Sequence, residues 1–145
     1  STNPGESLKP LSQVASGGEL SRIMLAIKTV LAGRDEIDTL IFDEIDTGIS
    51  GRTAWKVAEQ LSVLSGAHQV ICITHLPQIA AMADVHFVIE KSSTDDMTIT
   101  DIHKVSAEES LAELARLLGS DALTEAALSN AKEMKEQAGM FKETR

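Results

Sequence analysis

The residues at positions 16–19, Ser-Gly-Gly-Glu, stand where an apolar helical pattern begins, and they could face a phosphate group. Ser16 and Glu19 have the spacing of a capping box, in which each side chain satisfies a backbone donor of the first turn. Gly17 and Gly18 leave that turn unshielded, so an anion could approach its amides and the positive end of the helix dipole. The box alone favours a capped helix without a ligand. Two glycines weaken that interpretation, because each costs a helix about 1 kcal/mol.

Two adjacent carboxylates, Asp43 and Glu44, end an apolar run at residues 38–44, where ligand groups collect in open α/β sheets. Successive strand residues point to opposite faces, so the two groups can have different roles. Asp43 could hold Mg²⁺, and Glu44 could orient or deprotonate water. An isolated pair of this kind more often ends a strand in solvent. Asp46 could extend the pair to a metal cluster, but a turn-forming role before Gly48 is the favoured interpretation.

His75 follows a further apolar run, at residues 68–74, and is expected at a strand end near the same edge as Glu44. A lone histidine is more often structural than catalytic, and the other histidines lack partners at zinc-site spacing. The chain contains no Gly-x-x-x-x-Gly-Lys-Ser/Thr phosphate loop, nor even a Gly-Lys dipeptide. The sequence therefore predicts part of an ATP site.

These motifs resemble those of the RecN family, whose members are bacterial SMC-like DNA repair ATPases of the ABC type. The matching segments read Ser-Gly-Gly-Glu-Leu-Ser-Arg at 16–22, Phe-Asp-Glu-Ile-Asp-Thr-Gly-Ile-Ser-Gly at 42–51 and Thr-His-Leu-Pro-Gln-Ile-Ala at 74–80. The resemblance runs from about Asn3 to the end of the last helix. It implies that residues 1–145 form the C-terminal portion of an ABC-type P-loop ATPase head, without the Walker A phosphate loop and the coiled coil.

The resemblance also implies a role for each matching residue, with ATP and Mg²⁺ as cofactors of the complete protein. Asp43 would hold Mg²⁺, while Glu44 and His75 would be catalytic, orienting water and contacting the γ-phosphate. The signature residues would contact ATP bound to the opposite protomer; these are Ser16, Gly17, Gly18 and Glu19, with Arg22 as a second-line candidate. Gly48 and Ser50 fall in the D-loop, which crosses the dimer interface. The wider ABC pattern has an Asp where this chain has Ser50, a departure that fits the RecN subgroup.

The apolar periodicity alternates as in an α/β fold, with parallel buried strands flanked by helices and a β-hairpin. Helical spacing predicts helices at 17–32, with Gly33 as its C-cap, and at 54–64, 77–83, 107–118 and 122–138. Near-continuous apolar runs predict strands covered on both faces at 38–44 and 68–74. Residues 85–91 and 97–105 predict an antiparallel hairpin around a polar turn at 92–96. Residues 1–15 are predicted to be irregular.

Composition restricts the class of protein further. The 145 residues suit one domain, and a single cysteine, Cys72, cannot form an internal disulfide. No apolar run is long enough to span a bilayer and no basic, apolar leader begins the chain, so a cytoplasmic, nucleoid-associated location without membrane contact is expected. The net charge of −9 argues against a free-standing nucleic-acid binder. DNA is therefore expected to bind through the full-length protein.

We expect the chain to be part of the ATP-hydrolysing head of a RecN-like protein that acts in DNA double-strand break repair and recombination. Its expected partners are its own N-terminal head half, with Walker A, and a second head across ATP; the chain alone is expected to be inactive. One alternative is another ABC ATPase, such as a transporter subunit, but Pro-Thr would then replace Ile45-Asp46. The other is a non-catalytic interaction module of the same fold, against which the presence of Asp43, Glu44 and His75 argues.

Overall fold

A computed structural model of the chain describes residues 10, 15–31, 34, 36–94, 97–119 and 123–144. The chain divides into two compact units, Ser1–Thr74 and His75–Arg145. The predicted irregular start at 1–15 and the predicted C-cap at Gly33 lie outside the described residues, apart from positions 10 and 15 of the first segment. No helix of the described part is long and apolar enough to cross a membrane.

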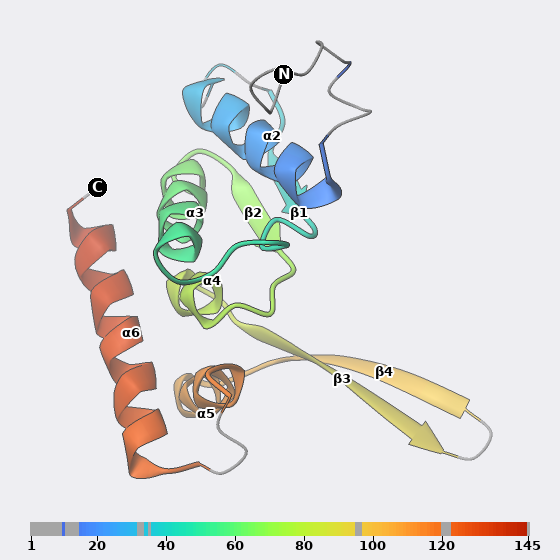
Figure 1. Cartoon of the computed structure of the whole chain (residues 1–145), viewed down its shortest axis with the longest axis vertical. Helices are drawn as coiled ribbons and strands as arrows, with labels where there is room; N and C mark the ends of the chain where they lie inside the picture. Colours follow the sequence, from blue (N-terminus) through green and yellow to red (C-terminus); the bar gives the residue numbers. More distant parts are fainter. Residues whose placement is uncertain are drawn as a thin grey trace, which may run out of the picture. The chain divides into compact units, whose positions relative to one another are not determined.

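The first unit contains a β-α-β arrangement preceded by a helix (Figure 1). Helix α2 spans Gly17–Leu31, strand β1 Thr39–Phe42, helix α3 Gly51–Leu64 and strand β2 Gln69–Cys72. The strands pair in parallel, with Thr39 opposite Gln69 and Phe42 opposite Cys72. Parallel neighbours need a crossover connection, and α3 provides it. The predicted α/β organisation with parallel strands is therefore confirmed in this unit.

The core of the first unit forms beneath α3. Its buried side chains recur at helical spacing, as expected for an amphipathic helix; they are Ala54, Val57, Ala58, Leu61 and Leu64. Leu25 of α2 and Phe42 of β1 are buried as well. This packing leaves the end of β1, with Asp43 and Glu44, at the surface.

The prediction of strands buried on both faces is wrong for the described residues. Phe42 is buried and Cys72 is half-buried on one face of the pair, whereas Ile41 is 68% exposed and Ile71 44% exposed on the other. Buried parallel sheets carry covering elements on both faces, and the described elements cover only one. Both strands are also shorter than predicted: β1 ends at Phe42, where the chain turns, and β2 ends at Cys72.

The second unit combines a β-hairpin with three helices. Its elements are α4 (Pro77–Met82), β3 (Phe87–Thr94), β4 (Met97–Lys104), α5 (Ala107–Leu117) and α6 (Glu125–Glu143). Helix α6 packs against α4 and α5, and its buried side chains Ala131, Met134 and Ala138 follow helical spacing. On α5, Leu114 is fully buried.

The hairpin and the last helix run further than predicted. Ser92 pairs with Ile99 and Thr94 with Met97, so the antiparallel ladder continues through the residues that were expected to form the turn. Helix α6 begins later, at Glu125, because the Thr124 side chain caps it by accepting from the Ala127 amide. The hairpin itself is confirmed.

Candidate functional site

Asp43 and Glu44, the carboxylates predicted to hold Mg²⁺ and to orient water, lie in a turn directly after β1. Asp43 and Glu44 are both exposed, and the Glu44 amide donates a hydrogen bond to Asp43 Oδ1 at 2.9 Å. Glu44 has a φ of 57°, a left-handed conformation that costs a residue with a side chain roughly 1–2 kcal/mol. Neighbouring contacts must therefore hold this turn in place.

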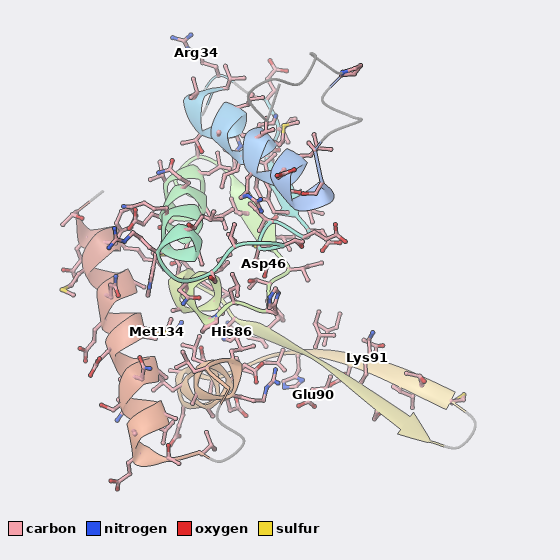
Figure 2. The ribbon with its side chains drawn as sticks, in the orientation of Figure 1. Arg34, Asp46, His86, Glu90, Lys91 and Met134 are labelled. Carbon is pink, nitrogen blue, oxygen red and sulfur yellow. The ribbon has the colours of Figure 1, made fainter. Side chains whose placement is uncertain are left out.

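Buried residues of the turn supply one set of those contacts. Ile45 is fully buried and Asp46 is 3% exposed. The Asp46 carboxylate accepts a hydrogen bond of 2.6 Å from Thr74 Oγ1, just beyond β2, and Figure 2 shows Asp46 in the segment between β1 and α3. This bond and the burial of its side chain agree with the interpretation of Asp46 as a turn-forming residue. Its carboxylate links the ends of the two parallel strands.

The predicted capping box at the start of α2 is confirmed. The Ser16 amide donates to Glu19 Oε2 at 2.8 Å, and the Glu19 amide donates to Ser16 Oγ at 3.3 Å. The hydrogen bond from the Ser16 amide, followed by the Ser16 side chain, holds the pKa of Glu19 below its usual value. The helix start is thus fixed by its own side chains.

The glycines of this helix start have a second role that the sequence did not reveal. A Cβ atom on Gly18 would lie 2.8 Å from the carbonyl oxygen of Glu44 and 3.0 Å from Thr47 Cβ. On Gly17 it would lie 2.6 Å from Glu44 Oε2. Glycine therefore allows the start of α2 to pack directly against the turn that carries Asp43 and Glu44, within the same chain.

Two further side chains of α2 fasten this contact. Arg22 Nη1 donates to the carbonyl oxygens of Ile45, at 3.0 Å, and Thr47, at 2.9 Å, while Ser21 Oγ donates to the Asp43 carbonyl at 3.0 Å. Arg22 thus binds the turn, and its contact with a phosphate stays a prediction. Sequence reasoning missed Ser21 entirely, because neither its type nor its spacing indicates a backbone carbonyl as partner.

The predicted D-loop residues end the same turn. Gly48 has a φ of 75°, in the left-handed region that glycine tolerates. Ser50 precedes α3 at its N-cap position, but its side chain makes no capping hydrogen bond there. Ser50 is exposed, and its role at a dimer interface stays a prediction.

The remaining predicted site residue, His75, is exposed and opens the second unit. Its catalytic pairing with Glu44 therefore stays a prediction. Cys72, at the end of β2, is half-buried, and burial together with Asp46 and Asp43 raises the pKa of its thiol to about 12. A protonated, partly buried thiol agrees with the interpretation of Cys72 as a small apolar residue.

The geometry defines a class of site: an exposed Asp-Glu pair at the end of a parallel strand, packed against a glycine-containing, capped helix start.

No family model matches the chain. It is 49% identical to the DNA repair protein RecN of Bacillus subtilis (strain 168) over 144 residues, which are 99% of this chain and 25% of that protein. It is 52% identical to the DNA repair protein RecN of Treponema pallidum (strain Nichols) over 134 residues, or 92% of this chain and 23% of that protein.

The DNA repair protein RecN of Deinococcus radiodurans is 49% identical over 134 residues, again 92% of this chain and 23% of that protein. Such identity over nearly the whole chain, in bacteria as different as these, confirms the resemblance seen in the motifs. The chain belongs to the RecN family. It spans about a quarter of the length of the curated relatives it matches.

Proposed function

We propose that this chain is the C-terminal portion of the ATP-hydrolysing head of a RecN-type protein that acts in DNA double-strand break repair and recombination. The repair role is supported by the name of its relatives, DNA repair protein RecN. The observation that carries the ATPase role is the contact between the start of α2 and the turn after β1. It joins a capped, glycine-containing helix start to the Asp43–Glu44 pair in one unit.

The exposed carboxylates fit the chemistry of ATP hydrolysis. Carboxylate oxygens are hard ligands of the kind that Mg²⁺ prefers, and Asp43, at the strand end, would hold the ion. Bound Mg²⁺ would neutralise charge on the phosphates. Glu44 would orient the attacking water and take its proton. The left-handed backbone of Glu44, held by α2, would fix the direction of that side chain.

The exposed apolar side chains of the first unit support the proposal that another segment covers them in the complete protein. Ile41 and Ile71 share the open face of the sheet, and Val30 on α2 is 83% exposed. Neighbouring exposed apolar side chains such as Ile41 and Ile71 mark an interaction site. We assign its cover to the N-terminal half of the same head, which would also bring the Walker A loop that this chain lacks.

A second head would complete the site across ATP. Ser16, Gly17, Gly18 and Glu19 would face the γ-phosphate held by the partner head, Gly48 and Ser50 would lie in the interface, and His75 would contact the γ-phosphate. DNA would bind elsewhere in the full-length protein, since this chain is acidic. A cytoplasmic, nucleoid-associated location would follow. Identity to proteins named for DNA repair favours this function over a transporter subunit.

The first experiment tests the catalytic pair in the intact protein. Glu44→Gln should slow steady-state ATP hydrolysis by about a hundredfold or more while ATP still binds, because a positioned base is lost. Asp43→Asn should raise the Mg²⁺ concentration needed for activity. Glu36→Gln is the matched control, since Glu36 is also exposed and precedes β1. Normal turnover in Glu44→Gln would show that Glu44 does not activate water.

The second experiment tests the contact across the dimer. Gly18→Asp, an otherwise obvious choice, would disturb the turn of its own chain, because any Cβ there meets the Glu44 carbonyl. Ser16→Asp is cleaner, because Asp is as good an N-cap as Ser but adds a negative charge. Ser16→Asn is its neutral, equally capping control.

Ser16→Asp should bind ATP as a monomer yet fail to form the ATP-driven head dimer, since its carboxylate would repel the γ-phosphate. Ser16→Asn should dimerise normally. Mixing the Ser16→Asp head with a head whose phosphate loop is disabled places both defects in one composite site and leaves the other intact. About half the activity should then survive if the sites act independently. Normal dimerisation of Ser16→Asp would rule out the contact.

A further inference from the structure

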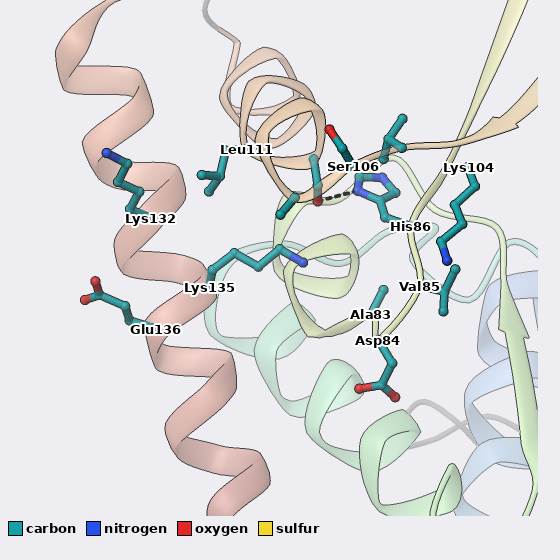
Figure 3. Close-up of a pocket in the computed structure, with 13 residues that line it drawn as sticks. Ala83, Asp84, Val85, His86, Lys104, Ser106, Leu111, Lys132, Lys135 and Glu136 are labelled. Carbon is teal, nitrogen blue, oxygen red and sulfur yellow. Dashed lines mark hydrogen bonds between the residues drawn. The ribbon is translucent and has the colours of Figure 1, made fainter.

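The second unit contains a cavity of about 600 Å³ that the proposed ATPase function does not use. Its wall is formed by the link between α4 and β3, the segment from the end of β4 into α5, and one side of α6 (Figure 3). The apolar part of the wall includes Val85, Val105 and Leu111. All of these residues belong to the same compact unit.

A half-buried lysine, Lys135 on α6, enters this cavity. Figure 3 shows its side chain extending from α6 toward His86, whereas Lys132 and Glu136 point away on the outer side of the helix. Asp84 lies near enough to influence Lys135, but the Asp84 carboxylate pairs with Lys142. Among the described residues, no carboxylate lies within ion-pairing distance of the Lys135 ammonium. Burial and Lys142 lower the pKa of Lys135, as expected for a cation that lacks a counter-ion.

A part-buried hydrogen-bonding pair lines the same cavity. His86 Nδ1 lies 2.9 Å from Oγ of Ser110, which is 4% exposed, so Ser110 orients the imidazole ring. When the Ser110 hydroxyl donates to Nδ1, the proton of the neutral ring sits on Nε2 and is free to be donated. Lys104, at the end of β4, lines the cavity on the side opposite α6 (Figure 3).

The charges around the cavity are unbalanced in favour of cations. Lys104, Lys132 and Lys135 line it with Asp84 and Glu136, and Lys142 pairs with Asp84. The lining itself has three lysines against two carboxylates, a surplus of one positive charge, in a chain whose net charge is −9.

We propose that this cavity binds a phosphate group, held by Lys135 and Lys104 and by the His86 ring that Ser110 orients. A phosphate offers acceptor oxygens in a tetrahedral arrangement and carries up to two negative charges near neutral pH. It therefore matches donors that converge from different elements in a cavity with a surplus of positive charge. A carboxylate offers only two coplanar oxygens, which fit donors from three different elements less well. The phosphate can belong to a free ion or nucleotide, or to the backbone of a nucleic acid whose main contacts lie elsewhere in the full-length protein.

The test uses the intact protein with its ATP site saturated by a non-hydrolysable ATP analogue, so that added phosphate reports on the cavity. Inorganic phosphate, a nucleoside monophosphate and a short single-stranded DNA are each titrated by calorimetry. Lys135→Gln should weaken phosphate binding by about tenfold, as expected for the loss of a charge-assisted hydrogen bond. Lys91→Gln removes the same charge from an exposed position of β3 outside the cavity, and should change the affinity by less than about twofold.

The three probes separate the two sources of the phosphate. Binding of inorganic phosphate and the monophosphate without DNA would identify a free ligand, and displacement of phosphate by DNA would identify a backbone phosphate. Either result supports the site if Lys135→Gln reduces it and Lys91→Gln does not. If Lys135→Gln fails to fold, Lys104→Gln and the NMR signals of the His86 ring in the unaltered protein decide the matter, since phosphate should shift those signals.

No phosphate binding, or equal binding to Lys135→Gln and Lys91→Gln, would overturn the proposal. So would unchanged His86 ring signals at a phosphate concentration that saturates the protein. Because the Asp43–Glu44 pair belongs to the other unit, this failure would leave the proposed ATPase function standing. Conversely, normal hydrolysis in Glu44→Gln would refute the ATPase assignment without bearing on the cavity.

Discussion

The contact between Arg22 and the turn after β1 allows a quantitative prediction. Arg22 Nη1 donates to two backbone carbonyls, at Ile45 and Thr47, one of them partly buried and the other exposed. Hydrogen bonds that involve a charged group contribute about 1.5–3 kcal/mol when shielded from water. Allowing for solvent exposure, about 1 kcal/mol for each bond is reasonable, so Arg22→Ala should destabilise the docked turn by about 2 kcal/mol.

Amide hydrogen exchange measures this loss locally. The Thr47 amide donates to the Glu44 carbonyl and the Ile49 amide to the Asp46 carbonyl, so both are protected only while the turn is formed. A loss of about 2 kcal/mol corresponds to a fall in protection of about thirtyfold at these two amides. Amides in the middle of α6 serve as an internal reference, because they belong to the other unit.

The same change should reach catalysis in the intact protein. If Glu44 activates water only while the turn is docked, Arg22→Ala should lower kcat by up to about thirtyfold and leave the KM for ATP within about threefold. Arg22→Lys can restore one of the two bonds and should recover part of the loss. Arg52→Ala is the matched control, since Arg52 is an exposed arginine of α3. Equal protection of Thr47 and Ile49 in Arg22→Ala and Arg52→Ala would refute the reasoning.

Three further predictions follow from particular residues. Leu114→Ala should destabilise the second unit by about 3 kcal/mol, because Leu114 is fully buried. Leu123→Ala, at a site 61% exposed, should cost less than about 0.5 kcal/mol. Chemical unfolding measures both, and equal stability of the two variants would show that Leu114 does not belong to the core. Burial and Lys135, opposed by Glu113, hold the pKa of His86 below its usual 6.5, so the unfolded chain takes up more protons. The stability due to His86 is thus present above pH 6.5 and lost as the pH falls through the lower pKa of the folded state. The unfolding midpoint of His86→Gln should therefore depend less on pH in that window than the midpoint of the unaltered protein. An unchanged pH dependence would contradict this. The chain by itself should show only background ATP hydrolysis, since it has no phosphate loop, and turnover abolished by Glu44→Gln would contradict the half-site interpretation.

The sequence by itself determined the local features of this protein. The Ser16–Glu19 capping box needs only the right side chains three residues apart, and both of its bonds form as predicted. The amphipathic α3, the two strands that it joins and the hairpin follow from apolar periodicity, which is a local property of the chain. The family, too, could be recognised from three short motifs in order.

The tertiary structure alone decided which of these pieces meet. Arg22 and Ser21 bind backbone carbonyls more than twenty residues away. Every residue has a backbone carbonyl, so the residue type does not indicate which one accepts a hydrogen bond. Asp46 could be a metal ligand or a turn residue by its sequence alone, and only the tertiary structure shows that its carboxylate accepts a bond from Thr74, just beyond β2. The open face of the β1–β2 pair could not be predicted from the sequence either. An apolar run indicates that both faces of a strand are covered, but it does not indicate which segment covers them.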